Sequence, residues 1–165
     1  VARMLNLPYP GGPEISKLAE QARVENIKNV IKLPRPMIHS KDLKFSFSGL
    51  KTAVLYTLKN IGEPSIDQKK DIAREFEDAV TEVIISKTLS AMNDNEVRTL
   101  IVGGGVVANT HIRKSFENLA KEKNIPLLSP TVGLTGDNAL MIALVGTQKP
   151  SSVTRAFRAE GNLSF

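Results

Sequence analysis

Residues 98–129 read RTLIVGGGVVANTHIRKSFENLAKEKNIPLLS. The segment opens with a short apolar run and breaks at three consecutive glycines. It continues with apolar residues at helical spacing as far as Asn124, which we expect to end the helix. A second apolar run follows at residues 125–128. A strand, a connecting helix and a second strand of this length make a βαβ unit, so the protein is expected to be of the α/β class.

The glycines of this unit predict a binding site. Gly103, Gly104 and Gly105 let backbone N–H groups approach an anion, and the helix that follows points its positive end at the same place. We expect a phosphate or the polar edge of a nucleotide there. Asn109 is expected about one turn into the helix, where its carboxamide could reach the same ligand. A tight strand-to-helix connection without a ligand is the structural alternative.

The same glycines partly match a dinucleotide-binding fingerprint, Gly103-x-Gly105-x-x-Ala108. That fingerprint needs an acidic residue at the end of the next strand, but Ser129-Pro130 follows here and Glu122 falls within the helix. A dinucleotide-binding oxidoreductase domain is therefore the weaker reading. A Walker-type phosphate loop is excluded because no Gly-Lys-Ser/Thr follows the glycines.

Outside this unit the apolar periodicity predicts mainly helices. A polar–apolar alternation at residues 44–48 predicts a strand, and Asp67 is a candidate N-cap. Asp137 would open a last helix that reaches about residue 145. The other predicted helices cover residues 14–24, 49–61 and 67–92.

Composition excludes several classes of protein. The 165 residues include no cysteine, which excludes disulfide scaffolds, iron–sulfur clusters and thiol nucleophiles and fits a cytoplasmic location. No apolar run approaches the roughly 18 residues that a membrane-spanning helix needs. The net charge of +5 is compatible with a nucleic-acid partner without requiring one.

Four ordered motifs together resemble one family. They are Tyr9-Pro-Gly-Gly-Pro13, FSFSGLKT at residues 45–52, VGGGVVAN at residues 102–109, and Gly136-Asp-Asn138 followed by Met-Ile-Ala at residues 141–143. In this order and spacing they look like the bacterial TsaD proteins, long described as O-sialoglycoprotein endopeptidases. The family transfers a threonylcarbamoyl group from threonylcarbamoyl-adenylate to N6 of the adenosine beside the anticodon of ANN-reading tRNAs.

The resemblance implies an actin-like ATPase fold with RNase H-like domains, of which this chain would be the C-terminal lobe with inserted helices. Residues 1–147 would form the lobe, with a helical insertion at about 14–93 and a nucleotide-binding βαβ unit at about 98–145. Residues 148–165 would be a tail. The chain starts at Val1 without an initiator Met, so we expect a fragment that lacks the N-terminal lobe.

The resemblance also implies roles for individual residues. Asp137 matches a metal ligand, Asn109 a residue that contacts the adenylate, and the Gly103–Gly105 turn the adenosine corner. Asn6 stands where the family commonly has a substrate-binding glycine. The implied cofactor is one divalent ion, iron, zinc or magnesium, whose His ligands would come from the missing lobe. No residue of the chain stands out as a general base.

The implied partners are tRNA, subunits of the TsaB and TsaE type, and the missing N-terminal lobe. Open strand edges in an isolated lobe predict self-association as well. We expect the fragment to be inactive alone. The remaining alternative is a non-catalytic half protein that binds a nucleotide or a partner.

Overall fold

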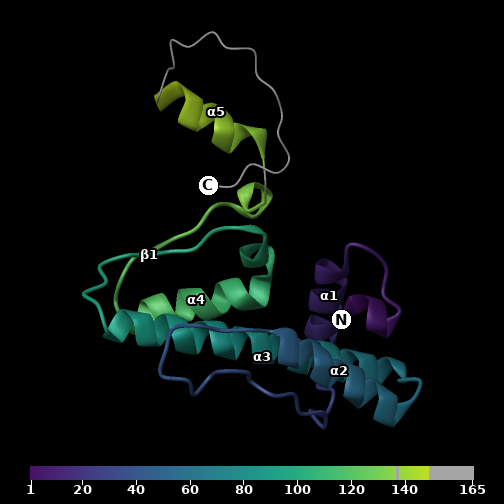
Figure 1. The fold of residues 1–165 in the computed structure, drawn as a ribbon. Helices are drawn as coiled ribbons and strands as arrows, with labels where there is room; N and C mark the ends of the chain where they lie inside the picture. The colour runs from purple at the N-terminus through teal and green to yellow at the C-terminus, as the bar shows by residue number, and fades with distance from the viewer. Residues whose placement is uncertain (137, 149–165) are drawn as a thin grey trace.

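The computed structural model describes residues 1–136 and 138–148. Helices dominate, and the long helix α3 runs through the middle of the fold (Figure 1). Among the described residues, none of the helices is long and apolar enough to cross a membrane. In chain order the elements are η1 (Ala2–Leu5), α1 (Gly11–Val24), α2 (Ser48–Ile61), α3 (Ile66–Asn93), β1 (Leu100–Ile101), η2 (Gly105–Ala108), α4 (Thr110–Glu122), β2 (Leu127–Leu128), η3 (Val132–Leu134) and α5 (Ala139–Gln148).

The predicted βαβ unit is confirmed. Strands β1 and β2 pair in parallel, with Leu100 opposite Leu127 and Ile101 opposite Leu128, and α4 connects them. Asn124 lies one residue beyond the C-cap of α4 in the left-handed conformation, with φ 52°. The N–H of Ile125 then donates to the carbonyl of Ala120, which is the Schellman arrangement that satisfies the last carbonyls of a helix.

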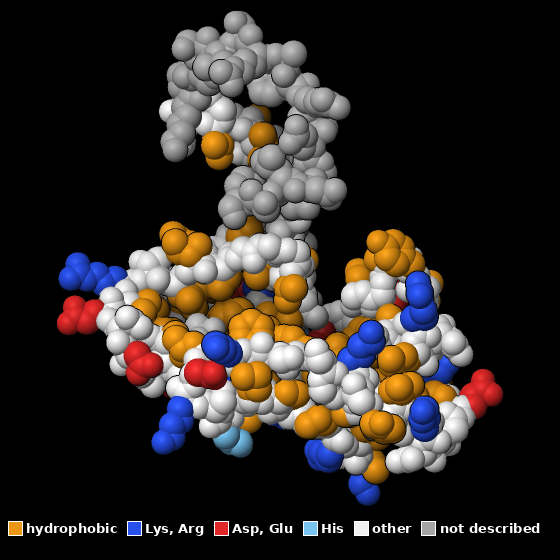
Figure 2. Space-filling model, in the orientation of Figure 1, with side chains coloured by type: hydrophobic (Ala, Val, Ile, Leu, Met, Phe, Trp, Pro, Cys, Tyr) orange, Lys and Arg blue, Asp and Glu red, His pale blue; other side chains and the backbone are white. Residues whose placement is uncertain are grey.

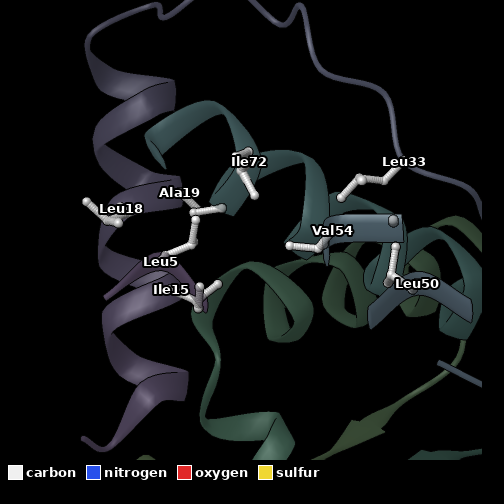
Figure 3. Packing of buried hydrophobic residues seen from close by; sticks show 10 residues of the cluster. Leu5, Ile15, Leu18, Ala19, Leu33, Leu50, Val54 and Ile72 are labelled. Carbon is white, nitrogen blue, oxygen red and sulfur yellow. The ribbon is translucent and has the colours of Figure 1, made fainter. Parts of the chain in front are cut away.

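Helix α3 carries the main apolar core. Ile72 lies between Leu5 and Ala19 on one side and Val54 on the other (Figure 3). The helix predicted at residues 14–24 is confirmed as α1, and four of its apolar residues are buried, namely Ile15, Leu18, Ala19 and Ala22. A second cluster joins the βαβ unit to the C-terminal half of α3 and contains Val102, Val107, Ile112 and Phe116.

Buried polar side chains of α3 hold the irregular segment at residues 25–47. The carboxylate of Asp71 accepts hydrogen bonds from the backbone N–H groups of Val30 and Ile31, both at 3.0 Å. Glu75 accepts from the N–H of Leu33 at 3.0 Å. Near the other end, the Lys87 ammonium donates to the backbone carbonyls of residues 40 and 42, both at 2.8 Å. Side chains of one helix thus satisfy five backbone groups of a segment that has no regular structure of its own.

Two local predictions were wrong. Residues 44–47 form no strand, because a strand needs a neighbour for its backbone groups and the described residues contain only the β1–β2 ladder. Asp67 is not the N-cap of α3. Ser65 is, and it forms a capping box in which its hydroxyl accepts from the N–H of Gln68 while the Gln68 side chain accepts from the N–H of Ser65.

The last helix, α5, begins at Ala139. Asn138 caps its N-terminus, because its Oδ1 accepts a hydrogen bond from the N–H of Met141 at 3.0 Å. The predicted opening of this helix by Asp137 falls on a residue outside the described part of the chain. None of the described side chains of α5 is buried.

The start of α1 passes very close to η1, which makes Gly11 sensitive to substitution. A Cβ atom built at Gly11 would lie 2.5 Å from the Cβ of Ala2, whereas one at Gly12 would meet nothing within 4 Å. We expect Gly11→Ala to lower the free energy of unfolding by about 1–3 kcal/mol through overpacking. Gly12→Ala is the matched control and should be neutral or stabilising, since Ala is the better helix former. Urea denaturation of both variants checks this, and equal midpoints would contradict it.

Candidate nucleotide-binding cleft

A cleft of about 1190 Å³ lies where the two clusters of the fold meet. Its walls come from the start of α1, the middle of α3, the start of α4 and the turn after β1. Figure 2 shows a notch between the part of the molecule that contains α4 and the part that contains α1. Most of the lining is apolar, and Phe45 and Phe47 contribute to it from the segment that α3 holds in place.

The glycine turn forms part of this wall. Gly103 and Gly105 line the cleft, and all three glycines are exposed. Gly104 has φ 88°, a conformation that glycine adopts without strain, and η2 follows directly. The turn is thus open to solvent, but the helix predicted to follow it directly does not: η2 intervenes, and α4 begins only at Thr110.

Asn109 lies at the N-cap of α4 and not one turn into the helix, so that part of the prediction was wrong. Its Oδ1 accepts a hydrogen bond from the backbone N–H of Ile112 at 3.0 Å. Asparagine is a preferred N-cap because its side chain satisfies an amide that the helix leaves unpaired. The residue also lines the cleft, as a nucleotide-contacting side chain would have to.

A polar cluster forms the floor of the cleft beside Asn109. Oε1 of Glu77 accepts from Nδ2 of Asn109 at 2.6 Å and from the hydroxyl of Ser16 at 2.8 Å. Asn109 Nδ2 also donates to Ser16 Oγ at 3.2 Å. The other carboxylate oxygen of Glu77 accepts from Arg23 at 2.6 Å, so this buried charge is paired.

Glu77, Ser16 and Arg23 were not predicted from the sequence. Glu77 offered one signal, because it interrupts the apolar stripe of α3 between Ala73 and Val80, which are its neighbours on that face. Ser16 and Arg23 carry no comparable signal. Their role depends on how α1 lies across α3.

A second polar cluster lies next to this floor. Asp78 accepts from Arg23 at 2.5 Å, and its Oδ1 lies 3.1 Å from Nε2 of His111. Burial raises the pKa of Asp78, but hydrogen bonds and charge from His111 and Arg23 outweigh burial, so the pKa is lowered overall. His111 thus has a carboxylate partner within the fold.

The lowered pKa of Asp78 predicts a pH-dependent contribution to stability. The folded state favours the ionised form, so the contribution is present above the ordinary carboxyl pKa and is lost as the pH falls through the lower, folded value. We expect Asp78→Asn to lower the free energy of unfolding by about 1–2 kcal/mol at neutral pH. The difference from wild type should shrink at pH values below about 4. Urea denaturation across pH 3–7 measures it, and a constant difference would contradict the prediction.

Asn6, a further residue of the predicted site, is not part of the cleft lining. Asn6 follows η1 in the left-handed conformation, with φ 55° and ψ 39°, and is exposed. Glycine and asparagine are the residues that adopt this conformation most readily, which accounts for an asparagine where the resemblance implied a glycine. Its side chain is not among those that line the cleft.

Asp137 lies outside the described residues, so its expected role as a metal ligand has no geometry here. Residues 1–136 and 138–148 contain no group of three or more His, Asp or Glu side chains placed to hold a metal ion.

Comparisons with known proteins agree with the motifs. The sequence profile of "TsaD: tRNA N6-adenosine threonylcarbamoyltransferase" matches residues 1–144. Proteins with the same description are similar to the chain, at 46% identity over 146 residues in Thermosipho africanus and 46% over 147 residues in Paraburkholderia xenovorans. These matches cover 88% of this chain.

The chain spans 43% of the length of the Thermosipho africanus relative and 42% of the Paraburkholderia xenovorans one. The weaker reading as a dinucleotide-binding oxidoreductase domain finds no support in these matches. With the profile matching across the βαβ unit and the helices before it, the chain belongs to the TsaD family.

Proposed function

We propose that this chain supplies the nucleotide-binding lobe of a tRNA N6-adenosine threonylcarbamoyltransferase. The observation that carries the proposal is the family match over residues 1–144, which includes the whole βαβ unit. The substrates would be threonylcarbamoyl-adenylate and the adenosine beside the anticodon of ANN-reading tRNAs. The lobe would belong to an actin-like ATPase fold, whose parallel strands and crossover helix are of the kind seen in β1, α4 and β2.

The cleft suits the adenylate part of that substrate. Backbone N–H groups of the Gly103–Gly105 turn would face the negatively charged or polar edge of the nucleotide. The apolar side chains of Phe45 and Val106 offer a surface for the base. Asn109 would add a directed hydrogen bond at the floor, so that binding energy fixes the position of the reacting group.

The reaction itself is an acyl transfer. The N6 amine of the tRNA adenosine attacks the carbamoyl carbon, a C–N bond forms and the amine releases one proton to solvent. The C–O bond to the phosphate breaks, and AMP leaves with its electron pair. Positioning of the two substrates supplies much of the rate in such a reaction. Asp137 is proposed as one ligand of the family's metal ion, which when bound would polarise the carbonyl group. Asn6 is proposed to lie near the nucleoside, as the resemblance implies.

The family resemblance is also the basis for the proposed partners, which are tRNA, further protein subunits and an N-terminal lobe. The net charge of +5 is favourable for a tRNA partner. Subunits of the TsaB and TsaE type and an N-terminal lobe would complete the enzyme. Ile101 and Leu128 remain 74% and 54% exposed on the two-stranded sheet, which leaves an apolar surface for a neighbouring lobe or a second copy of the chain.

A chimera tests the proposed function. The region of the Thermosipho africanus relative that matches this chain over 146 residues is replaced by the corresponding residues of this chain. We expect the chimera, with its partner subunits, to form threonylcarbamoyladenosine on an ANN-reading tRNA. Asp137→Asn should abolish product formation, whereas Asp94→Asn, at the exposed end of α3, should retain it. A folded chimera without product would overturn the proposal.

A further inference from the structure

The carboxamide of Asn109 is held in one orientation by its neighbours. The carboxylate of Glu77 can only accept hydrogen bonds, so the NH₂ group of Asn109 must face it at 2.6 Å. The backbone N–H of Ile112 can only donate, so Oδ1 must face that group at 3.0 Å. The alternative orientation would put a carbonyl oxygen against a carboxylate and an NH₂ group against an N–H. The network therefore assigns the two ends of the amide without ambiguity.

This orientation decides what Asn109 can offer a ligand. Its Nδ2 group donates to Glu77 at 2.6 Å and to Ser16 Oγ at 3.2 Å, so the NH₂ group is directed at these two neighbours. Its Oδ1 accepts one hydrogen bond, from Ile112, and has a second lone pair. Ser16 donates its only hydroxyl hydrogen to Glu77, so its remaining capacity is also that of an acceptor. The polar floor of the cleft thus presents acceptors.

Charge supports the same conclusion. The side chain of Glu77 is 3% exposed and its negative charge is compensated by Arg23, which lies on the side of Glu77 away from Asn109 and is shared with Asp78. An acceptor-rich floor with a buried carboxylate disfavours a phosphate at this point and favours a hydroxyl or amino group. The phosphate of an adenylate would then lie elsewhere in the cleft.

We propose that Glu77, assisted by Ser16, is a positioning residue that orients the Asn109 carboxamide, so that Asn109 accepts a hydrogen bond from a hydroxyl or amino group of the bound nucleoside. The inference rests on the proposed function for the identity of the ligand. The positioning itself is a property of the free chain, which lets the two be tested separately.

Two substitutions at residue 77 separate positioning from stability. Both Glu77→Leu and Glu77→Gln remove the ion pair with Arg23, which keeps Asp78 as a partner. Only Glu77→Gln retains an oxygen that can accept from Asn109 and Ser16. A role in stability alone would leave the AMP affinity of both folded variants near that of wild type, whereas a positioning role makes their affinities differ. Ser16→Ala is the milder third variant, because it removes the weaker of the two acceptors of Asn109.

The first measurement uses the chain without ligand. In ¹⁵N-labelled protein, the two side-chain NH₂ protons of Asn109 should be well resolved and protected from exchange. We expect Glu77→Leu to abolish this protection, Ser16→Ala to reduce it, and Glu77→Gln to preserve it. Protection that is unchanged in Glu77→Leu would overturn the inference. Should Glu77→Leu not fold, Ser16→Ala decides in the same way.

The second measurement is the affinity for AMP by titration. We expect Glu77→Leu to weaken binding about tenfold, the equivalent of one directed hydrogen bond, and Glu77→Gln to stay near wild type. Asn109→Ala should weaken binding as much as Glu77→Leu, and the double variant no further. Additive losses would overturn the inference. Wild-type chain that does not bind AMP, with the NH₂ signals behaving as expected, would overturn the proposed ligand and leave the positioning intact.

Discussion

Glu75→Ala is expected to lower the free energy of unfolding by about 3–5 kcal/mol. Glu75 lies in the middle of α3, and its side chain is 1% exposed. It accepts from the N–H of Leu33 at 3.0 Å and forms a short ion pair with Arg35. Removing the carboxylate leaves a buried N–H without an acceptor and takes away the buried partner of a guanidinium.

A second partner of Arg35 supplies the matched control. Glu82 pairs with the same guanidinium at 2.7 Å, but its side chain is 52% exposed. Exposed ion pairs contribute little, so Glu82→Ala should cost less than about 1 kcal/mol. Urea denaturation followed by circular dichroism compares the two variants. Similar losses in the two variants would contradict the expectation that the buried carboxylate of Glu75 contributes more to stability than the exposed carboxylate of Glu82.

Ile72→Ala is expected to lower the free energy of unfolding by about 2–5 kcal/mol. Ile72 is fully buried where α3 meets α1, η1 and α2, and its neighbours are Leu5, Ala19 and Val54 (Figure 3). The variant loses the transfer free energy of the removed methyl and methylene groups and leaves a cavity that three separate helices would have to fill.

Ile66 is the control for this prediction because it is an isoleucine of the same helix. It is 59% exposed at the first turn of α3, so Ile66→Ala changes the same atoms without opening a cavity. We expect an effect of less than about 0.5 kcal/mol. Thermal or urea denaturation of the pair gives the cost of the cavity by difference. Equal losses would contradict the proposed core.

Local signals predicted most of the secondary structure. Apolar spacing located α1, α2 and α3 to within a few residues, and the three glycines between two apolar runs predicted the parallel pairing of β1 with β2. These features depend on residues close together in the chain, where periodicity and backbone preference act. The same kind of reasoning failed at residues 44–47, because alternation favours a strand only where another strand is available.

The polar residues of α3 could not be placed from sequence. In a helix wheel Asp71, Glu75 and Lys87 look like ordinary solvated charges. Each is buried because the segment at residues 25–47 lies over it and brings backbone groups that need partners. The stability of that segment, and with it the placement of Phe45 and Phe47 at the cleft, comes from contacts made some 40 or more residues apart.

The candidate site likewise has features that the local sequence predicts and features that depend on tertiary packing. Sequence alone determined the family, the glycine turn and the presence of Asn109 beside it, because these are short motifs within one βαβ unit. Tertiary structure decided that Asn109 caps α4 and that Glu77 and Ser16, which lie 32 and 93 residues away in the chain, hold its carboxamide. The physical reason is that a hydrogen bond requires atoms within about 3 Å in a fixed direction. Only the packing of α1 and α4 against α3 brings these three side chains together.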